Sequence, residues 1–112
     1  MIIRDICGIV KASVVCGDDT KPCEGVYAGD FLSRAMSRVQ SDNLWITIMS
    51  NVNVIAVATL TEPAAILLAE GVTLQADALA SAEENGITVL SSPLSAYELC
   101  ARIHQAFSEK KA

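Results

Sequence analysis

Two short and almost wholly apolar runs, at residues 44–49 and 64–69, constrain the fold of this chain more than any other feature of its sequence. Runs of this length without polar alternation are typical of strands buried on both faces of a sheet. Along the rest of the chain, strand-type segments alternate with helix-type segments, as expected of right-handed βαβ units. We therefore predict an α/β fold with a mainly parallel sheet of about four to five strands, flanked by helices on both faces.

Local periodicity and capping residues predict the individual elements. Asp30 precedes an apolar helical stripe and is expected to cap that helix through its carboxylate. Asn51 and Asn53 offer caps to the next helix, which Pro63 ends. The predicted helices cover residues 2–10, 31–39, 53–62, 75–85 and 94–109, and the predicted strands cover residues 12–16, 25–28, 44–49, 64–69 and 87–90.

The chain is short and acidic. Its 112 residues suffice for one core, and no linker or repeat interrupts them, so residues 1–112 are expected to form a single domain. A formal charge of −5, without any basic cluster, makes nucleic acid an unsuitable partner. No apolar run reaches the roughly 20 residues that a bilayer crossing needs, and the N-terminus lacks the features of a signal peptide. We therefore expect a cytoplasmic protein that binds neither nucleic acid nor membrane.

The four cysteines, Cys7, Cys16, Cys23 and Cys100, form no CxxC pair and are spaced too widely for a typical metal or iron–sulfur centre. Without a secretory context, disulfides are not expected either. Cys7 and Cys100 fall on apolar faces of predicted helices, whereas Cys16 and Cys23 flank a polar loop where exposure is open to them. We predict buried, reduced thiols, no metal and no cofactor, and the sequence leaves a redox role for Cys16 and Cys23 open.

The predicted helix at residues 53–62 is apolar almost all round and offers no obvious face to solvent. Such a helix is either enclosed within the domain or packed against another copy of the chain. The low content of charged residues, 19%, favours self-association. We expect a homodimer, and we expect an Ile55→Asp substitution to dissociate it or to unfold the chain.

Small polar side chains follow each predicted parallel strand. In an open parallel sheet, ligands bind beyond the carboxyl ends of the strands, where helix N-termini offer N–H groups to an anion. The same residue types cap helices, so a binding crevice and capping alone are both open interpretations. Lys21 is the only basic residue in a plausible position. The candidate ligand-binding residues are Gly29, Asp30, Asn51, Asn53, Glu70, Ser91 and Ser92.

No set of residues in the sequence is typical of a catalytic site. The phosphate-binding loop GxxxxGK[ST] is absent, so phosphoryl transfer lacks its usual machinery. His104 is the only histidine, and catalysis would require partners beyond Cys100, which lies one helical turn away. Asp18 and Asp19 lie in a predicted turn, where solvation accounts for them. We predict that the chain is not an enzyme.

One segment near residue 25 and four later segments share a pattern with a known domain. The first, residues 20–30, reads TKPCEGVYAGD, and the later ones are residues 44–48, 53–58, 86–92 and 94–98. Together they resemble the DRTGG domain, a regulatory module of prokaryotic proteins, over nearly the whole chain. Thr20 and Lys21 stand where typical members have Asp-Arg, and Val26 stands where a second glycine is expected.

This resemblance implies regulation rather than catalysis. DRTGG domains accompany CBS domains in certain inorganic pyrophosphatases and occur in some phosphate acetyltransferases. They are similar to the N-terminal domain of HPr kinase/phosphorylase, and they pair across dimer interfaces. Small stand-alone versions occur in anaerobic prokaryotes, some near hydrogenase genes, which implies a partner protein in anaerobic redox metabolism.

Two functional hypotheses follow. The first is a non-catalytic regulatory or ligand-sensing module that binds a nucleotide or small anion at the carboxyl ends of the strands. The alternative is a purely structural protein-interaction subunit, acting as a homodimer without a small-molecule ligand. The polar residues at the strand ends favour the first hypothesis, whereas the acidic charge and the scarcity of basic residues there favour the second.

Overall fold

The computed structural model describes residues 1–111, with side chains for residues 1–109, and it contains one five-stranded sheet. The strand order is β1-β5-β4-β3-β2, in which β2 to β5 are parallel and β1 is antiparallel to β5. The predicted α/β fold with a mainly parallel sheet is therefore confirmed. The strands are β1 (Ser13–Cys16), β2 (Gly25–Ala28), β3 (Asn43–Thr47), β4 (Ala65–Leu68) and β5 (Val89–Ser91).

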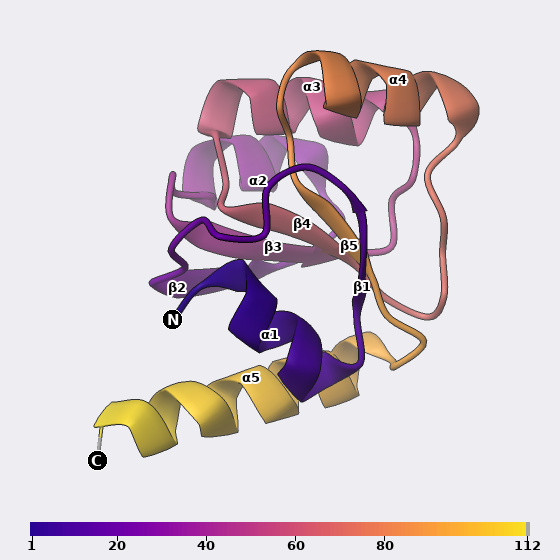
Figure 1. The fold of residues 1–112 in the computed structure, drawn as a ribbon. Coiled ribbons are helices and arrows are strands. Elements are labelled where there is room, and N and C mark those ends of the chain that lie inside the picture. Colours follow the sequence, from indigo (N-terminus) through magenta and orange to yellow (C-terminus); the bar gives the residue numbers. More distant parts are fainter. Residues whose placement is uncertain (112) are drawn as a thin grey trace.

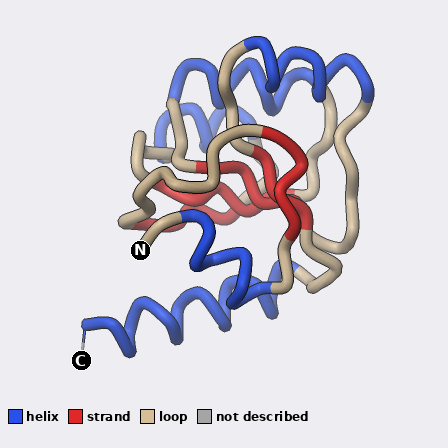
Figure 2. The backbone as a smooth tube through the Cα atoms, in the orientation of Figure 1, coloured by secondary structure: helices blue, strands red, loops and turns tan. Residues whose placement is uncertain are grey.

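Helices cover both faces of the sheet (Figure 1). They are α1 (Ile3–Val10), α2 (Leu32–Arg38), α3 (Val52–Thr61), α4 (Ala76–Glu84) and α5 (Ala96–Lys111). Figure 2 shows the strands between two helical layers: α2, α3 and α4 on one face, α1 and α5 on the other. None of these helices, within the part of the chain described, combines the length and apolarity needed to span a membrane.

The central strands bury both of their faces. In β3, Trp45 contributes to the core beneath α2, α3 and α4, while its neighbours Leu44 and Ile46 contribute to the core beneath α1 and α5. In β4, Ile66 and Leu67 divide in the same way. Successive side chains of a strand point to opposite faces, so a continuous apolar run supplies both cores. This is the physical reason that the two apolar runs predicted the fold.

A glycine allows β1 to lie along β5 in the antiparallel direction. Gly17 has φ = 93°, and a Cβ atom there would lie 2.4 Å from the Cα of Thr88. Only glycine fits such a close backbone approach with a positive φ. Across this contact the Thr88 hydroxyl donates to the carbonyl of Asp18 at 2.8 Å. The attachment of the edge strand β1 therefore depends on Gly17, which has no side chain.

Helix α3 is neither fully enclosed nor fully exposed, because one of its faces is buried and the other faces solvent. Val54, Ile55, Val57 and Ala58 are buried against the sheet and the neighbouring helices. Leu60, on the outer face, is 71% exposed. The Ile55→Asp substitution would therefore place a charge in the core, so it would report on folding rather than on self-association.

Of the two predicted helix caps, the cap of α3 is confirmed and the cap of α2 is wrong. The Asn51 side chain accepts a hydrogen bond from the Asn53 amide at 3.0 Å and caps α3, as predicted. The predicted cap of α2 by Asp30 is wrong: Phe31 occupies the N-cap position without a side-chain hydrogen bond. The Asp30 carboxylate is engaged elsewhere, at the end of β3.

The cysteine environments agree with the prediction of buried thiols at two of the four positions. Cys16 and Cys23 are buried, although the polar loop between them suggested exposure, while Cys7 and Cys100 are only half-buried. The Cys23 Sγ lies 3.4 Å from the carbonyl of Gly25, and the Cys16 Sγ lies 3.4 Å from the carbonyl of Ile87. Both thiols therefore face inward from the loop ends and donate weak hydrogen bonds to backbone oxygens.

Candidate functional site

A small pocket lies at the carboxyl ends of β2 and β3. Its volume is about 230 Å³, and it is bordered by the first turn of α5. The loops that follow β2 and β3 supply most of its wall. The lining residues are Ala28, Gly29, Asp30, Ile46, Thr47, Ile48 and Ala96.

Asp30 joins the two loops of this pocket. One carboxylate oxygen, Oδ1, accepts hydrogen bonds from the Thr47 hydroxyl at 2.6 Å and from the Ile48 amide at 3.0 Å. The Thr47 Oγ1 in turn accepts from the Met49 amide at 3.2 Å. Thr47 is 2% exposed, whereas Asp30 is exposed. The buried hydroxyl thus fixes one oxygen of an accessible carboxylate.

Gly29 is held by the same strand ends. Its amide donates to the carbonyl of Ile46 at 3.0 Å, and its carbonyl accepts from the indole nitrogen of Trp45 at 3.0 Å. A Cβ atom on Gly29 would approach the Tyr27 hydroxyl at 3.1 Å, so a side chain there would crowd the ring of Tyr27. Gly29 and Asp30 are therefore the two predicted site residues that the structure brings together in one pocket.

The first turn of α5 contributes the electrostatics of the opposite wall. Ser95 caps this helix, because its hydroxyl accepts from the Glu98 amide at 3.2 Å and its carbonyl accepts from the Leu99 amide at 3.0 Å. A helix N-terminus carries a partial positive charge, which favours an anionic group nearby. The pocket therefore has a carboxylate on one wall and a helix N-terminus on the other.

The two predicted serines are occupied in holding the fold. The Ser91 hydroxyl donates to the carbonyl of Val72 at 2.9 Å. Ser92 is 1% exposed; its hydroxyl donates to the carbonyl of Val10 at 2.7 Å and accepts from the Leu94 amide at 3.1 Å. Neither serine lines the strand-end pocket.

The remaining predicted residues also lie away from this pocket. Glu70 is exposed, with φ = 60°, and its amide donates to the carbonyl of Leu94 at 2.8 Å. Asn51 caps α3. Asn53 lines a different groove of about 520 Å³ between α2 and α3. Of the seven candidate residues, the strand-end pocket is lined by Gly29 and Asp30.

Thr47, Ile48 and Ala96 line the pocket but were not predicted as site residues. One signal for Thr47 was available, because it is the one hydroxyl residue within the apolar run at residues 44–49. Nothing in the sequence indicated that Ala96 would line the pocket, because an alanine lines a pocket only through the position of its helix.

The most spacious of the described pockets lies at the amino ends of the parallel strands. Its volume is about 580 Å³. Lys21 belongs to this pocket, and its Nζ donates to the carbonyl of Gly86 at 3.1 Å. The interpretation that placed Lys21 near the strand-end site is therefore wrong. The lining also includes two carboxylates, Asp42 and Glu62, so this pocket is unsuited to an anion.

Residues 5–106 match the family model of the DRTGG domain. This chain belongs to the DRTGG domain family. The segment that resembles the name-giving motif of the family runs along the edge strand β2. It begins with Thr20 and Lys21 at the amino end of the sheet and ends with Gly29 and Asp30 in the strand-end pocket.

A solved structure has the same fold as this DRTGG domain. It comprises the CBS and DRTGG domains of the regulatory region of Clostridium perfringens pyrophosphatase, in complex with the activator diadenosine tetraphosphate. The TM-score is 0.74 at 14% sequence identity, and the match covers 90% of this chain and 45% of that chain. The present chain thus corresponds to less than half of that regulatory region. No curated protein matches the sequence.

Proposed function

We propose that this DRTGG domain is a non-catalytic regulatory module that senses a nucleotide or another small anionic ligand at the strand-end pocket. The observation that carries this proposal is the arrangement of Asp30. Its Oδ1 is fixed by Thr47 and Ile48, and among the described residues no hydrogen bond engages its Oδ2. An accessible carboxylate oxygen on a fixed side chain is an acceptor for hydroxyl or amino groups of a ligand.

The charges of the pocket favour a nucleotide over a bare anion. The Asp30 carboxylate repels a phosphate placed directly against it, whereas it accepts hydrogen bonds from the hydroxyl groups of a ribose. The N-terminus of α5 favours the anionic part of the ligand. A ligand with hydroxyl groups at one end and negative charge at the other fits both walls.

The pocket is smaller than the roughly 300–1,000 Å³ of typical small-molecule sites, so its 230 Å³ would enclose only part of a nucleotide. The rest would extend into solvent or against another protein. Binding would connect the loops after β2 and β3 with α5, and the second of these loops leads directly into α3. Such a ligand regulates only if it binds one conformation better than another.

A nucleotide is also the first ligand class to test because of the related fold. The Clostridium perfringens regulatory region was crystallised with diadenosine tetraphosphate. That protein also contains CBS domains, so its ligand does not identify the ligand of this chain.

A thermal-shift screen of mononucleotides and dinucleoside polyphosphates tests the proposal. A ligand at one hundred times its Kd adds about 2.7 kcal/mol, which corresponds to a rise in Tm of roughly 10 °C for a domain of this size. Asp30→Asn keeps an acceptor for Thr47 but removes the charge, and it should reduce the shift. Glu70→Gln, an equally exposed change outside the pocket, should leave the shift intact. A shift that is equal in both variants would refute the site.

The second candidate function is a structural interaction subunit that acts as a homodimer, with a partner protein in anaerobic redox metabolism as the resemblance implies. The observation that favours it is the internal use of Asn51, Ser91 and Ser92, whose side chains serve the fold. A screen without any stabilising ligand, together with a stable dimer, would support this candidate.

In either role we propose no catalysis. Incubation with labelled ATP and Mg²⁺ should give no phosphoryl transfer.

A further inference from the structure

The pocket at the amino ends of the parallel strands, here called the amino-end pocket, is separate from the strand-end pocket that contains Asp30. Its volume of about 580 Å³ lies within the roughly 300–1,000 Å³ of typical small-molecule sites. The buried part of its lining is apolar and consists of Pro63, Ala64 and Ile87. The amino-end pocket is therefore large enough to enclose a whole small molecule, and it offers that molecule an apolar surface.

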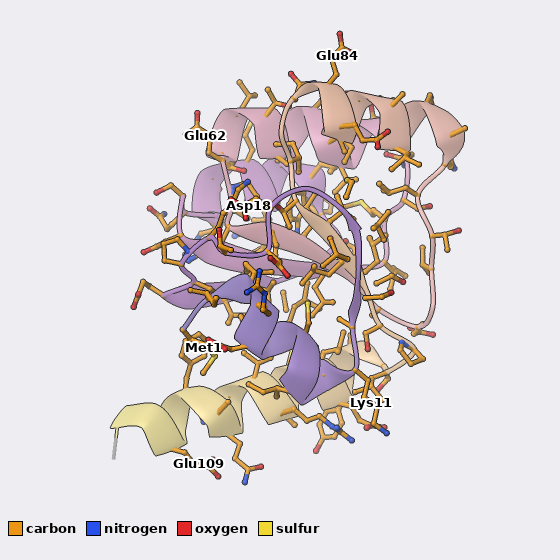
Figure 3. The ribbon with its side chains drawn as sticks, in the orientation of Figure 1. Met1, Lys11, Asp18, Glu62, Glu84 and Glu109 are labelled. Carbon is orange, nitrogen blue, oxygen red and sulfur yellow. The ribbon has the colours of Figure 1, made fainter. Side chains whose placement is uncertain are left out.

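Two carboxylates also line this pocket. Asp42 is half-buried and precedes β3, whereas Glu62 is exposed at the end of α3, as Figure 3 shows. The segments that carry them are joined by a hydrogen bond from the Ala64 amide to the carbonyl of Asn43 at 2.7 Å. Neither carboxylate forms an ion pair within the part of the chain whose side chains are described. Two negative charges on neighbouring segments are therefore available to a ligand.

Lys21 is the one basic residue in the described lining, and it does not neutralise these carboxylates. Its Nζ donates instead to the carbonyl of Gly86 at 3.1 Å. The pocket thus holds one ammonium group of its own on a backbone carbonyl. With two carboxylates against one ammonium group, the lining keeps an excess of negative charge.

The ends of α3 and α4 add to this negative charge. These helices end directly before Glu62 and Asn85, which both line the pocket. Neither helix has a basic residue in its last turn. A helix C-terminus carries a partial negative charge, so it favours cations and opposes carboxylates. The fold alone therefore gives Glu62, at the C-cap of α3, no favourable electrostatic partner, whereas a bound cation would.

We propose that the amino-end pocket binds a linear aliphatic diamine or polyamine. One ammonium group is recognised by Asp42 and another by Glu62, and the methylene chain between them lies along the buried apolar lining. Each charged group then gains a partner of opposite charge, and the methylene chain leaves water for an apolar surface. Such a site is independent of the proposed regulatory site, because the two pockets share no lining residue.

Other classes of ligand fit this lining less well. A divalent metal ion prefers several closely placed oxygen ligands, and the described residues contain no group of three or more His, Cys, Asp or Glu side chains that could hold a metal ion. A small anion is repelled by the excess of negative charge. A monoamine leaves one of the two carboxylates unpaired.

Calorimetric titration of the purified chain with putrescine tests the proposal, at low ionic strength so that exposed charges are little screened. Butylamine is the matched ligand, because it has the same carbon chain but a single amino group. We expect one putrescine to bind per chain, and butylamine to bind clearly more weakly. A wild-type chain that binds no putrescine at millimolar concentration, or that binds both amines equally, would overturn the proposal.

Glu62→Gln and Glu70→Gln are matched variants. Both residues are exposed and have a positive φ, 52° for Glu62 and 60° for Glu70, but Glu70 lies outside the amino-end pocket. Glu62→Gln should raise the Kd for putrescine about fivefold, and Asp42→Asn about as much. Glu70→Gln should leave the Kd unchanged. Equal effects of the two glutamate variants would indicate attraction by the acidic chain as a whole and would refute the pocket as the site.

Lys21→Met tests the site with the opposite sign. The substitution keeps most of the aliphatic side chain, but it removes the positive charge and the donor to the Gly86 carbonyl. Because a like charge in the same pocket opposes a cationic ligand, the Kd for putrescine should fall about threefold. Weaker binding by Lys21→Met would contradict the placement of the diamine in this pocket.

Discussion

The Thr47 hydroxyl donates a 2.6 Å hydrogen bond to the Asp30 carboxylate, across 17 residues of sequence and between the ends of two adjacent parallel strands. This bond joins the loops that follow β2 and β3 into one structure. The other carboxylate oxygen of Asp30, a residue that lines the strand-end pocket, has no hydrogen bond among the described residues. The candidate site of this DRTGG domain is therefore organised by a buried threonine that also lines the pocket.

Removal of the Thr47 hydroxyl should destabilise the domain. Thr47→Val retains the shape of the side chain, but it removes a donor to Asp30 and an acceptor for the Met49 amide. We expect the free energy of unfolding to fall by about 1–3 kcal/mol, measured by urea denaturation. Thr59→Val is the control, because Thr59 is an exposed residue whose hydroxyl donates to the carbonyl of Ile55, one turn earlier in its own helix. Equal effects in the two variants would contradict this role of Thr47.

A side chain at Gly17 should disrupt the attachment of β1 to β5. Gly17→Ala places a Cβ atom 2.4 Å from backbone at Thr88, and we expect a loss of more than about 3 kcal/mol in stability. Gly71→Ala is the matched control, because Gly71 has φ = 71° and open space around it. Its cost should be limited to the left-handed conformation, about 1–2 kcal/mol. Thermal denaturation of both variants measures the difference.

The loop after β1 should contribute to the stability of the protein against acid. The pKa of Asp19 is lowered by its hydrogen bond with the Arg4 guanidinium, and the pKa of Asp18 is lowered by its hydrogen bonds with Thr20. A carboxyl whose pKa is lower in the folded state stabilises the fold above the unfolded pKa, near 3.8 here. This contribution is lost as the pH falls further.

Denaturation of Asp19→Asn across the range from pH 6 to pH 2.5 tests this dependence. The variant should be slightly less stable than the wild type at pH 6, and the two should converge at the acidic end. Both carboxylates are at the surface, so the difference should be small. A difference that widens toward low pH would have the wrong sign.

Thiol labelling should follow the tertiary structure rather than the polarity of the neighbouring sequence. Burial raises the pKa of all four thiols, but Cys7 and Cys100 are half-buried while Cys16 and Cys23 are buried. Because the thiolate is the reactive form and must be reached by the reagent, iodoacetamide at pH 8 should modify Cys7 and Cys100 first. Peptide mass spectrometry over time measures the order. Early modification of Cys23 would contradict the buried position of its thiol.

Some features of the site were predictable because they depend on short-range patterns. Gly29 and Asp30 were predicted correctly as neighbours of the carboxyl end of a parallel strand, because strand direction follows from the alternation of strands and helices. The cap of α3 by Asn51 was predicted for the same kind of reason, since a cap bonds to an amide only two residues away. The ligand of the pocket remains a proposal.

Other features depended on contacts between residues distant in sequence. Asp30 had a local alternative, capping α2, and it bonds instead to Thr47 because the parallel pairing of β2 with β3 brings that hydroxyl within reach. Lys21 was placed at the wrong end of the sheet, because its loop packs against Gly86 at the amino ends of the strands. Burial of Cys16 and Cys23 likewise follows from how the loop ends pack, and not from the polar residues between them.

The sequence by itself thus determined the class of fold and the order of its elements, because apolar runs of strand length and helical periodicity are local consequences of which side chains avoid water. Only the tertiary structure decided the direction of β1, the partner of Asp30 and the position of Lys21 at the amino ends of the strands. The physical reason is that each of these depends on which segments become neighbours in space, and hydrogen bonds and burial between distant residues form only when the whole sheet is assembled.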